Sequence, residues 1–113
     1  MQVEVLMKLV IAIVSNDDCH TVLDEIMRAG FSATKLSTSG GFLRAGNATL
    51  LIGVEEEKLQ ELLDVIGRFC SKRKQIVQTQ PSFNADFFVS VPVEVSVGGA
   101  TVFVLDVEQF HKL

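Results

Sequence analysis

The stretch KLVIAIVSNDDCHTVLDEIMRAG, residues 8–30, predicts a strand followed by a helix and decides how the fold begins. Lys8–Ser15 is an apolar run of strand length rich in Val and Ile, which is typical of a central strand buried on both faces. The polar residues 16–18 then offer an N-cap and early negative charge for a helix. The apolar residues of this helix recur at helical spacing, at Val22, Leu23, Ile26 and Met27. Gly30 is expected to end it.

Two further strands and a second helix follow. Residues 31–38 alternate loosely and residues 47–54 (NATLLIGV) are apolar, and the turn signal at residues 39–41 separates these two strands. A helix is expected to open at the acidic residues 55–57 and to close at the basic residues 72–74, an arrangement that complements the helix dipole. Its apolar face consists of Leu59, Leu62, Leu63, Ile66 and Phe69.

The last third of the chain predicts a long loop and a hairpin. Residues 75–91 are mostly polar but contain three phenylalanines, and loops longer than about 12 residues are usually functional or disordered. The phenylalanines argue against disorder. Residues 93–97 and 101–105 are β-branched strands on either side of Gly98-Gly99, a pattern that predicts a hairpin with a primed turn. Residues 106–111 predict a short terminal turn or helix.

These elements follow the order β-α-β-β-α-β with one extra C-terminal strand, which is the ferredoxin-like plan of the α+β class. We expect residues 1–113 to form a single domain. Residues 1–6 are a candidate N-terminal extension, because Met7 is a plausible translation start. The ferredoxin-like fold hosts many unrelated functions, so it does not decide the activity.

Composition excludes several classes of function. The chain has 113 residues, of which 48% are hydrophobic, and a formal net charge of −4. Broad duplex DNA binding is disfavoured, because it depends on neutralising phosphates with a basic surface. The apolar surplus favours burial between subunits. Without a secretion signal or an apolar run of about 18 residues, a cytoplasmic protein is expected, with Cys19 and Cys70 as reduced, packed thiols.

Catalytic and metal-binding patterns are hard to find. His20 and His111 are the only two histidines, and neither belongs to a nucleophile or metal-ligand spacing. Asp17 and Asp18 could ligate a metal ion, but no further ligand lies nearby in the sequence, and capping of the helix is the preferred interpretation. We therefore expect no catalytic residue, no metal and no cofactor.

The stretch TKLSTSGGFLRAGNATLLIG, residues 34–53, carries the most information about function. Gly40-Gly41 would let backbone amides approach an anion closely, and Phe42 offers a face on which a base can stack. Asn47 and Thr34 supply hydrogen-bonding groups for a base edge or a ribose. The same apolar loop tip would equally suit a contact between subunits, and the residues alone leave both possibilities open.

Three strings resemble a known family: residues 33–55 (ATKLSTSGGFLRAGNATLLIGVE), 92–105 (PVEVSVGGATVFVL) and 107–111 (VEQFH). They closely resemble the PII-like cyclic di-AMP receptor family, and the similarity covers nearly the whole chain from Met7. It implies a homotrimer of ferredoxin-like subunits that binds cyclic di-AMP at each subunit interface and signals to a protein partner. It also implies a short loop between the second and third strands and a long one after the second helix. The ligand-binding positions that it implies are Thr34, Gly41, Phe42, Leu43, Asn47, Gly53 and Phe103, together with Ser32.

The chain also departs from the family. Ser32 stands where many members have Arg, Gly30 where they have Asn or a similar residue, and Lys112 where some have Gln. Loss of one charged hydrogen bond lowers affinity by about tenfold to a hundredfold. The resemblance nevertheless extends over nearly the whole chain, and we expect a non-catalytic cyclic di-AMP sensor. The alternatives are a PII-like interaction module with another nucleotide ligand or none, and a small enzyme acting on nucleotides.

Overall fold

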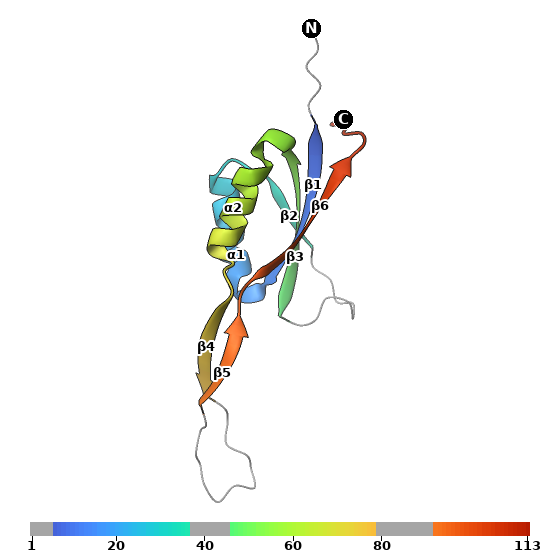
Figure 1. The fold of residues 1–113 in the computed structure, drawn as a ribbon. Coiled ribbons are helices and arrows are strands. Elements are labelled where there is room, and N and C mark those ends of the chain that lie inside the picture. The colour runs from blue at the N-terminus through green and yellow to red at the C-terminus, as the bar shows by residue number, and fades with distance from the viewer. Residues whose placement is uncertain (1–5, 37–45, 79–91) are drawn as a thin grey trace, which may run out of the picture.

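The computed structural model describes residues 6–36, 46–78 and 92–113 (Figure 1). Their elements, in chain order, are β1 (Met7–Ser15), α1 (Asn16–Arg28), β2 (Ala33–Leu36), β3 (Asn47–Glu55), a 3-10 turn (Glu56–Lys58), α2 (Leu59–Phe69), β4 (Arg73–Gln78), β5 (Pro92–Val97) and β6 (Ala100–Val107).

Four of these strands form one antiparallel sheet in the order β2-β3-β1-β6. Both helices lie on the same side of the sheet (Figure 1). β1 occupies a central position, as its apolar sequence predicted, and pairs with β3 on one side and β6 on the other. It is not buried on both faces as expected, because Val10, Ala12 and Val14 are buried while its odd-numbered residues are only half-buried. The arrangement confirms the ferredoxin-like fold, in which β6 takes the place of the last strand.

The end of α1 is fixed by Gly30 and by two backbone hydrogen bonds that close its last turn. Gly30 adopts a left-handed conformation with φ of +96°, which a glycine reaches without steric cost. The Phe31 N–H donates to the Ile26 carbonyl at 3.1 Å and the Gly30 N–H to the Met27 carbonyl at 3.0 Å. These two bonds and the burial of Phe31 and Ile26 form a Schellman motif. The predicted stop at Gly30 is confirmed.

The start of α1 differs from the prediction. Ser15, not one of residues 16–18, is the N-cap residue, and its hydroxyl accepts the Asp17 N–H at 3.2 Å. Asp18 instead turns inward, is buried, and forms an ion pair with Arg73 at 2.8 Å. The cap therefore came from the polar end of the strand, because a serine with extended backbone presents its oxygen to the first helical turn.

The core lies between the helices and one face of the sheet. Alternate residues of β1 and β3 point toward the helices, so the buried apolar side chains follow a period of two. Thr49 is also buried, although its register places it on the other face of the sheet. On α2, Leu62 and Ile66 of the predicted apolar face are buried, and Leu59 and Phe69 pack at its edge. The buried apolar residues are Val10, Ala12, Val14, Cys19, Val22, Ile26, Phe31, Ala48, Leu50, Ile52, Val54, Leu62, Ile66 and Cys70.

The C-terminal third corrects the sequence prediction in two ways. β4 pairs with β5 as a separate two-stranded arm, so residues 75–78 are strand, and the remainder of the predicted loop lies outside the described residues. The predicted hairpin around Gly98-Gly99 does not form, because β5 pairs with β4 while β6 pairs with β1. The two glycines connect the arm to the main sheet (Figure 1).

Two smaller expectations also fail. The basic residues 72–74 do not close α2, which ends at Phe69; two of them, Arg73 and Lys74, begin β4. Residues 106–111 do not form a helix, because Asp106 and Val107 extend β6 along β1, opposite Lys8 and Met7. An ion pair between Lys8 and Asp106 holds this end of the ladder and raises the pKa of Lys8.

Cys19 and Cys70 are free and buried, as predicted for packed thiols. Burial raises the pKa of the Cys70 thiol to about 11 from an ordinary value of 9.0, with a smaller contribution from the negative charge of Asp18. The folded state therefore holds the proton more tightly than the unfolded state.

We expect this difference to make stability depend on pH in the alkaline range. The contribution of the protonated thiol is fully present below pH 9 and is lost as the pH rises toward 11. The loss should approach about 1.4 kcal/mol per pH unit within that window. Urea denaturation of the wild type and of Cys70→Ala at pH 8 to 11 measures it. An equally steep decline in both proteins would contradict this origin.

Candidate functional site

The face of the sheet opposite the helices is not covered by any other described segment (Figure 1). By the register of the strands, it carries the odd-numbered residues of β1, β3 and β6 and the even-numbered residues of β2. We call it the open face. Most of its side chains are apolar: Met7, Leu9, Ile11, Ile13, Leu36, Leu51, Phe103, Leu105 and Val107. Three of them, Leu36, Phe103 and Leu105, are exposed large hydrophobic residues.

Four of the predicted ligand-binding residues lie on the open face. Thr34 is opposite Leu51, which is opposite Ile11, which in turn is opposite Phe103, so these residues form one row across the sheet. Asn47 and Gly53 lie on β3 on either side of this row. All four predicted residues are exposed, and Phe103 is 53% exposed. Their role as ligand contacts stays a prediction.

Gly53 leaves room for another molecule. A Cβ atom at this position would meet only the Met7 Cε atom, at 4.0 Å, and the backbone does not have the positive φ that requires glycine. Packing within the described residues therefore does not explain a glycine here. A close approach by a ligand or by a second subunit would explain why this position is a glycine.

The remaining predicted positions are placed differently. Ser32 is exposed and lies just before β2, next to the end of α1. Gly41, Phe42 and Leu43 lie outside the described residues. Lys112, one of the departures from the family, is exposed near the C-terminus, beyond the end of β6.

Asn47 and Gly53 are too far apart to bind one small ligand together. They are six residues apart on one strand, which corresponds to about 20 Å along the sheet. Both point to the same face, so the chain does not fold them toward one another. If both contact a ligand, each contact belongs to a different ligand molecule or to a site completed by a second copy of the chain.

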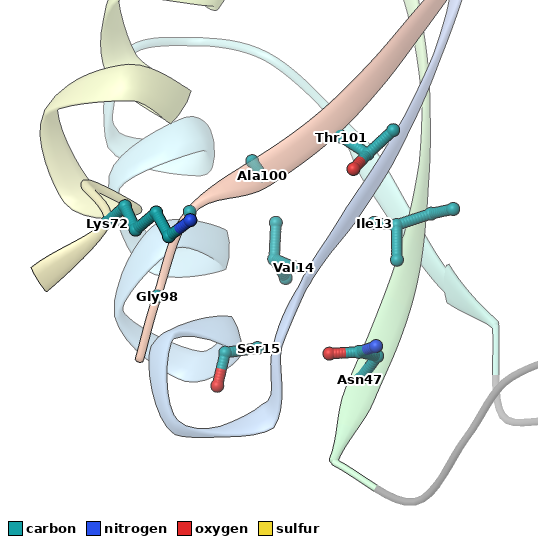
Figure 2. Close-up of a pocket in the computed structure, with 9 residues that line it drawn as sticks. Ile13, Val14, Ser15, Asn47, Lys72, Gly98, Ala100 and Thr101 are labelled. Carbon is teal, nitrogen blue, oxygen red and sulfur yellow. The ribbon is translucent and has the colours of Figure 1, made fainter. Parts of the chain in front are cut away.

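A pocket of about 350 Å³ lies at the Asn47 end of the sheet (Figure 2). It is lined by Ile13, Val14, Ser15, Asn47, Lys72, Gly98, Gly99, Ala100 and Thr101. Sequence reasoning found Asn47 but missed Lys72 and Gly98-Gly99, because a helix-dipole role and a hairpin turn already explained those residues. One feature of the sequence could have pointed to Lys72: Arg73 and Lys74 already supply positive charge after the helix, so the helix dipole does not require a lysine at position 72.

A charged contact fixes the structure beside this pocket. Arg73 donates to both carboxylate oxygens of Asp18, at 2.8 and 3.4 Å, and to the Ser71 carbonyl at 3.2 Å. The hydrogen bond with Asp18 is the main reason that the pKa of Arg73 is raised. These bonds tie the first strand of the arm to the first turn of α1.

The described residues hold no group of three or more His, Cys, Asp and Glu side chains that could bind a metal ion. His20 is exposed on α1, 3.4 Å from Asp24. His111 is exposed and lies 3.0 Å from the Gln109 side chain. Within the part of the chain that the structure describes, no helix has the length and apolar character needed to cross a membrane.

Comparison with known proteins decides the family. The family model described as cyclic-di-AMP receptor matches residues 7–113. The chain belongs to this receptor family. The receptor family is one of binding and signalling proteins, and its PII-like, α+β fold agrees with the sheet and helices described above.

A solved structure shares the fold of this receptor. It is the crystal structure of a functionally unknown protein from Pediococcus pentosaceus ATCC 25745, which is 41% identical in sequence. The alignment covers 96% of this chain and 98% of that one, with a TM-score of 0.75. The similarity therefore extends over nearly the whole length of both chains.

Proposed function

We propose that this receptor is a cytoplasmic, non-catalytic sensor that binds cyclic di-AMP at the subunit interfaces of a homotrimer and relays the signal to a protein partner. One observation carries the proposal: every predicted ligand residue within a described strand lies on the open face. This face is mostly apolar and, among the described residues, uncovered.

The apolar character of the open face supports assembly. Monomeric soluble proteins rarely expose contiguous apolar patches of more than a few hundred Å². Here exposed or half-buried apolar side chains continue across all four strands of the sheet. A second and third copy of the chain would cover them.

The separation of Asn47 from Gly53 supports a shared site. A ligand at the junction of two subunits could contact Asn47 of one copy and Gly53 or Phe103 of the next. Asn47 supplies an amide that both donates and accepts, as recognition of an adenine edge requires, and Phe103 supplies an aromatic face.

A second candidate ligand is another adenine nucleotide, and Ser32 favours it. Ser32 is exposed just before β2, two residues from Thr34, so an arginine at this position would reach the open face. Serine does not carry a charge to a phosphate. A receptor without that guanidinium would bind cyclic di-AMP more weakly or select a different phosphate arrangement.

Calorimetric titration with cyclic di-AMP, cyclic di-GMP, ATP and ADP tests the proposal, together with light scattering. We expect a trimer that binds cyclic di-AMP in preference to the other three nucleotides, with one site per subunit. Asn47→Ala should weaken binding by about tenfold, because a polar ligand edge loses its partner. Gln60→Ala is the control, since this exposed amide lies on α2 and contacts Asp64. A monomer, or preference for another nucleotide, would contradict the proposal.

A further inference from the structure

The pocket beside Asn47 is assembled from distant parts of the chain. Ser15 ends β1 and is paired with Asn47 at the start of β3. Lys72 lies between α2 and β4, and Gly98-Gly99 lie between β5 and β6. The pocket is thus the place where the arm joins the main sheet (Figures 1 and 2). Its volume of about 350 Å³ is at the lower end of the range for small-ligand pockets.

The charge of this pocket is opposite to that of the chain. Among the described residues that line it, Lys72 alone is charged, although the protein as a whole has a net charge of −4. The nearest carboxylate to Gly98 is that of Asp18, which is neutralised by Arg73 at 2.8 Å. The pocket therefore offers a positive charge that is not balanced by a carboxylate in its lining.

The position of Lys72 is set by packing. A Cβ atom on Gly99 would lie 3.6 Å from the Lys72 Cβ and 4.0 Å from its Cγ, so the stem of the lysine runs along this glycine. Figure 2 shows the side chain extending toward the Gly98–Ala100 segment. Lys72 is exposed and lines the pocket, so its ammonium group can meet an incoming ligand.

Backbone and hydroxyl groups complete a set of hydrogen-bond donors. Gly98 and Gly99 are consecutive residues with φ of +83° and +82°, and both line the pocket with backbone atoms alone. Packing also requires the glycine at position 98, because a Cβ atom there would lie only 2.5 Å from the Ser71 carbonyl oxygen and 2.7 Å from an Arg73 guanidinium nitrogen. The Ser15 hydroxyl accepts the Asp17 N–H, which leaves its own proton available to a ligand. Thr101 adds a second hydroxyl and Asn47 an amide. One ammonium group with several neutral donors is a suitable environment for a phosphate oxygen.

We infer that this pocket is a subsite for a phosphate group of the nucleotide ligand, with Lys72 as its counter-charge, an assignment that rests on the function proposed above. Asn47 belongs both to the pocket and to the open face, so the pocket adjoins that face at this residue. In a site completed by a second subunit, the Lys72 ammonium group of one copy would offset part of the charge that is absent at Ser32 of the other copy. Lys72 is therefore a specificity-determining residue for phosphorylated ligands.

Titration of the full-length protein with cyclic di-AMP tests the assignment through Lys72→Gln, Lys72→Arg and Lys74→Gln. Lys72→Gln should weaken binding by about tenfold and flatten its dependence on salt, because one ion contact is lost. Lys72→Arg keeps the charge and should stay within about threefold of the wild type. Lys74→Gln makes the same change of net charge two residues away, on the arm beside Glu94, and should have little effect.

The outcomes separate this assignment from the proposed function. If the wild type binds cyclic di-AMP and the two glutamine variants bind it equally well, the subsite is wrong and the proposed function stands. If the wild type does not bind, the proposed function is wrong, and inorganic pyrophosphate then tests the pocket by NMR at the Gly98 and Gly99 amides. Saturable shifts that disappear in Lys72→Gln would support the subsite, and their absence from the wild type would overturn it.

Discussion

Replacement of Arg73 by methionine is expected to lower the free energy of unfolding by about 2–3 kcal/mol. The Asp18 side chain is only 8% exposed, and its described partner is the Arg73 guanidinium at 2.8 Å. Loss of one member of a fully buried ion pair typically costs 3–5 kcal/mol, because the other charge is left without a partner. Arg73 is 49% exposed, so water can partly replace it and the expected cost is smaller.

Urea denaturation of a double-mutant cycle measures this effect. Asp18→Asn with Arg73→Met should recover part of the loss, because an amide is less costly to bury than a carboxylate. Arg28→Met is the control, since Arg28 pairs with Glu25 at 2.9 Å on the exposed side of α1 and is expected to contribute less than about 0.5 kcal/mol. Equal losses in Arg73→Met and Arg28→Met would show that the contact between arm and helix does not stabilise the fold.

The elements that sequence reasoning placed correctly are those whose signal is local. The apolar run in β1, the helical spacing on α1 and the stop at Gly30 each depend on neighbouring residues, and all three agree with the structure. These patterns were sufficient for the ferredoxin-like order of elements.

The errors concern pairing between strands, which local patterns do not specify. Gly98-Gly99 is a strong turn signal, but a turn signal does not say that its two flanking strands pair with each other. β4, with the sequence RKQIVQ, was missed because it begins with two basic residues and has only two apolar side chains. The basic residues already had an explanation as the end of α2. β4, the strand with which β5 pairs, therefore lay partly within the predicted loop and was not recognised as a strand.

The candidate site shows the same division. The alternation of side chains along a strand places Asn47 and Gly53 on one face, and this follows from the sequence alone once β3 is identified. That Thr34 and Phe103 share this face depends on strand order and register, which only the structure supplies. Lys72 joins Asn47 in one pocket through the same long-range packing.

The largest effect is expected where the open face would meet another subunit. Leu105→Asp places a carboxylate on this face, opposite Leu9. If three copies bury the face, each copy would then have to desolvate a charge without a partner in an apolar interface. That cost is at least about 3 kcal/mol per contact, which weakens association by more than about a hundredfold. We expect the variant to be a folded monomer at concentrations where the wild type is a trimer.

Val104 provides a matched control for this experiment. It is the neighbouring residue on β6 and has nearly the same exposure, 43% against 44% for Leu105, but it lies opposite Val10 and therefore points to the helix side of the sheet. Val104→Asp introduces the same charge on the same strand and should leave the trimer intact. Light scattering gives the mass of each variant, and thermal melts confirm that both are folded. Dissociation by Val104→Asp with an intact Leu105→Asp trimer would place the subunit contact on the helix side and remove the structural basis for a ligand site shared across the open face.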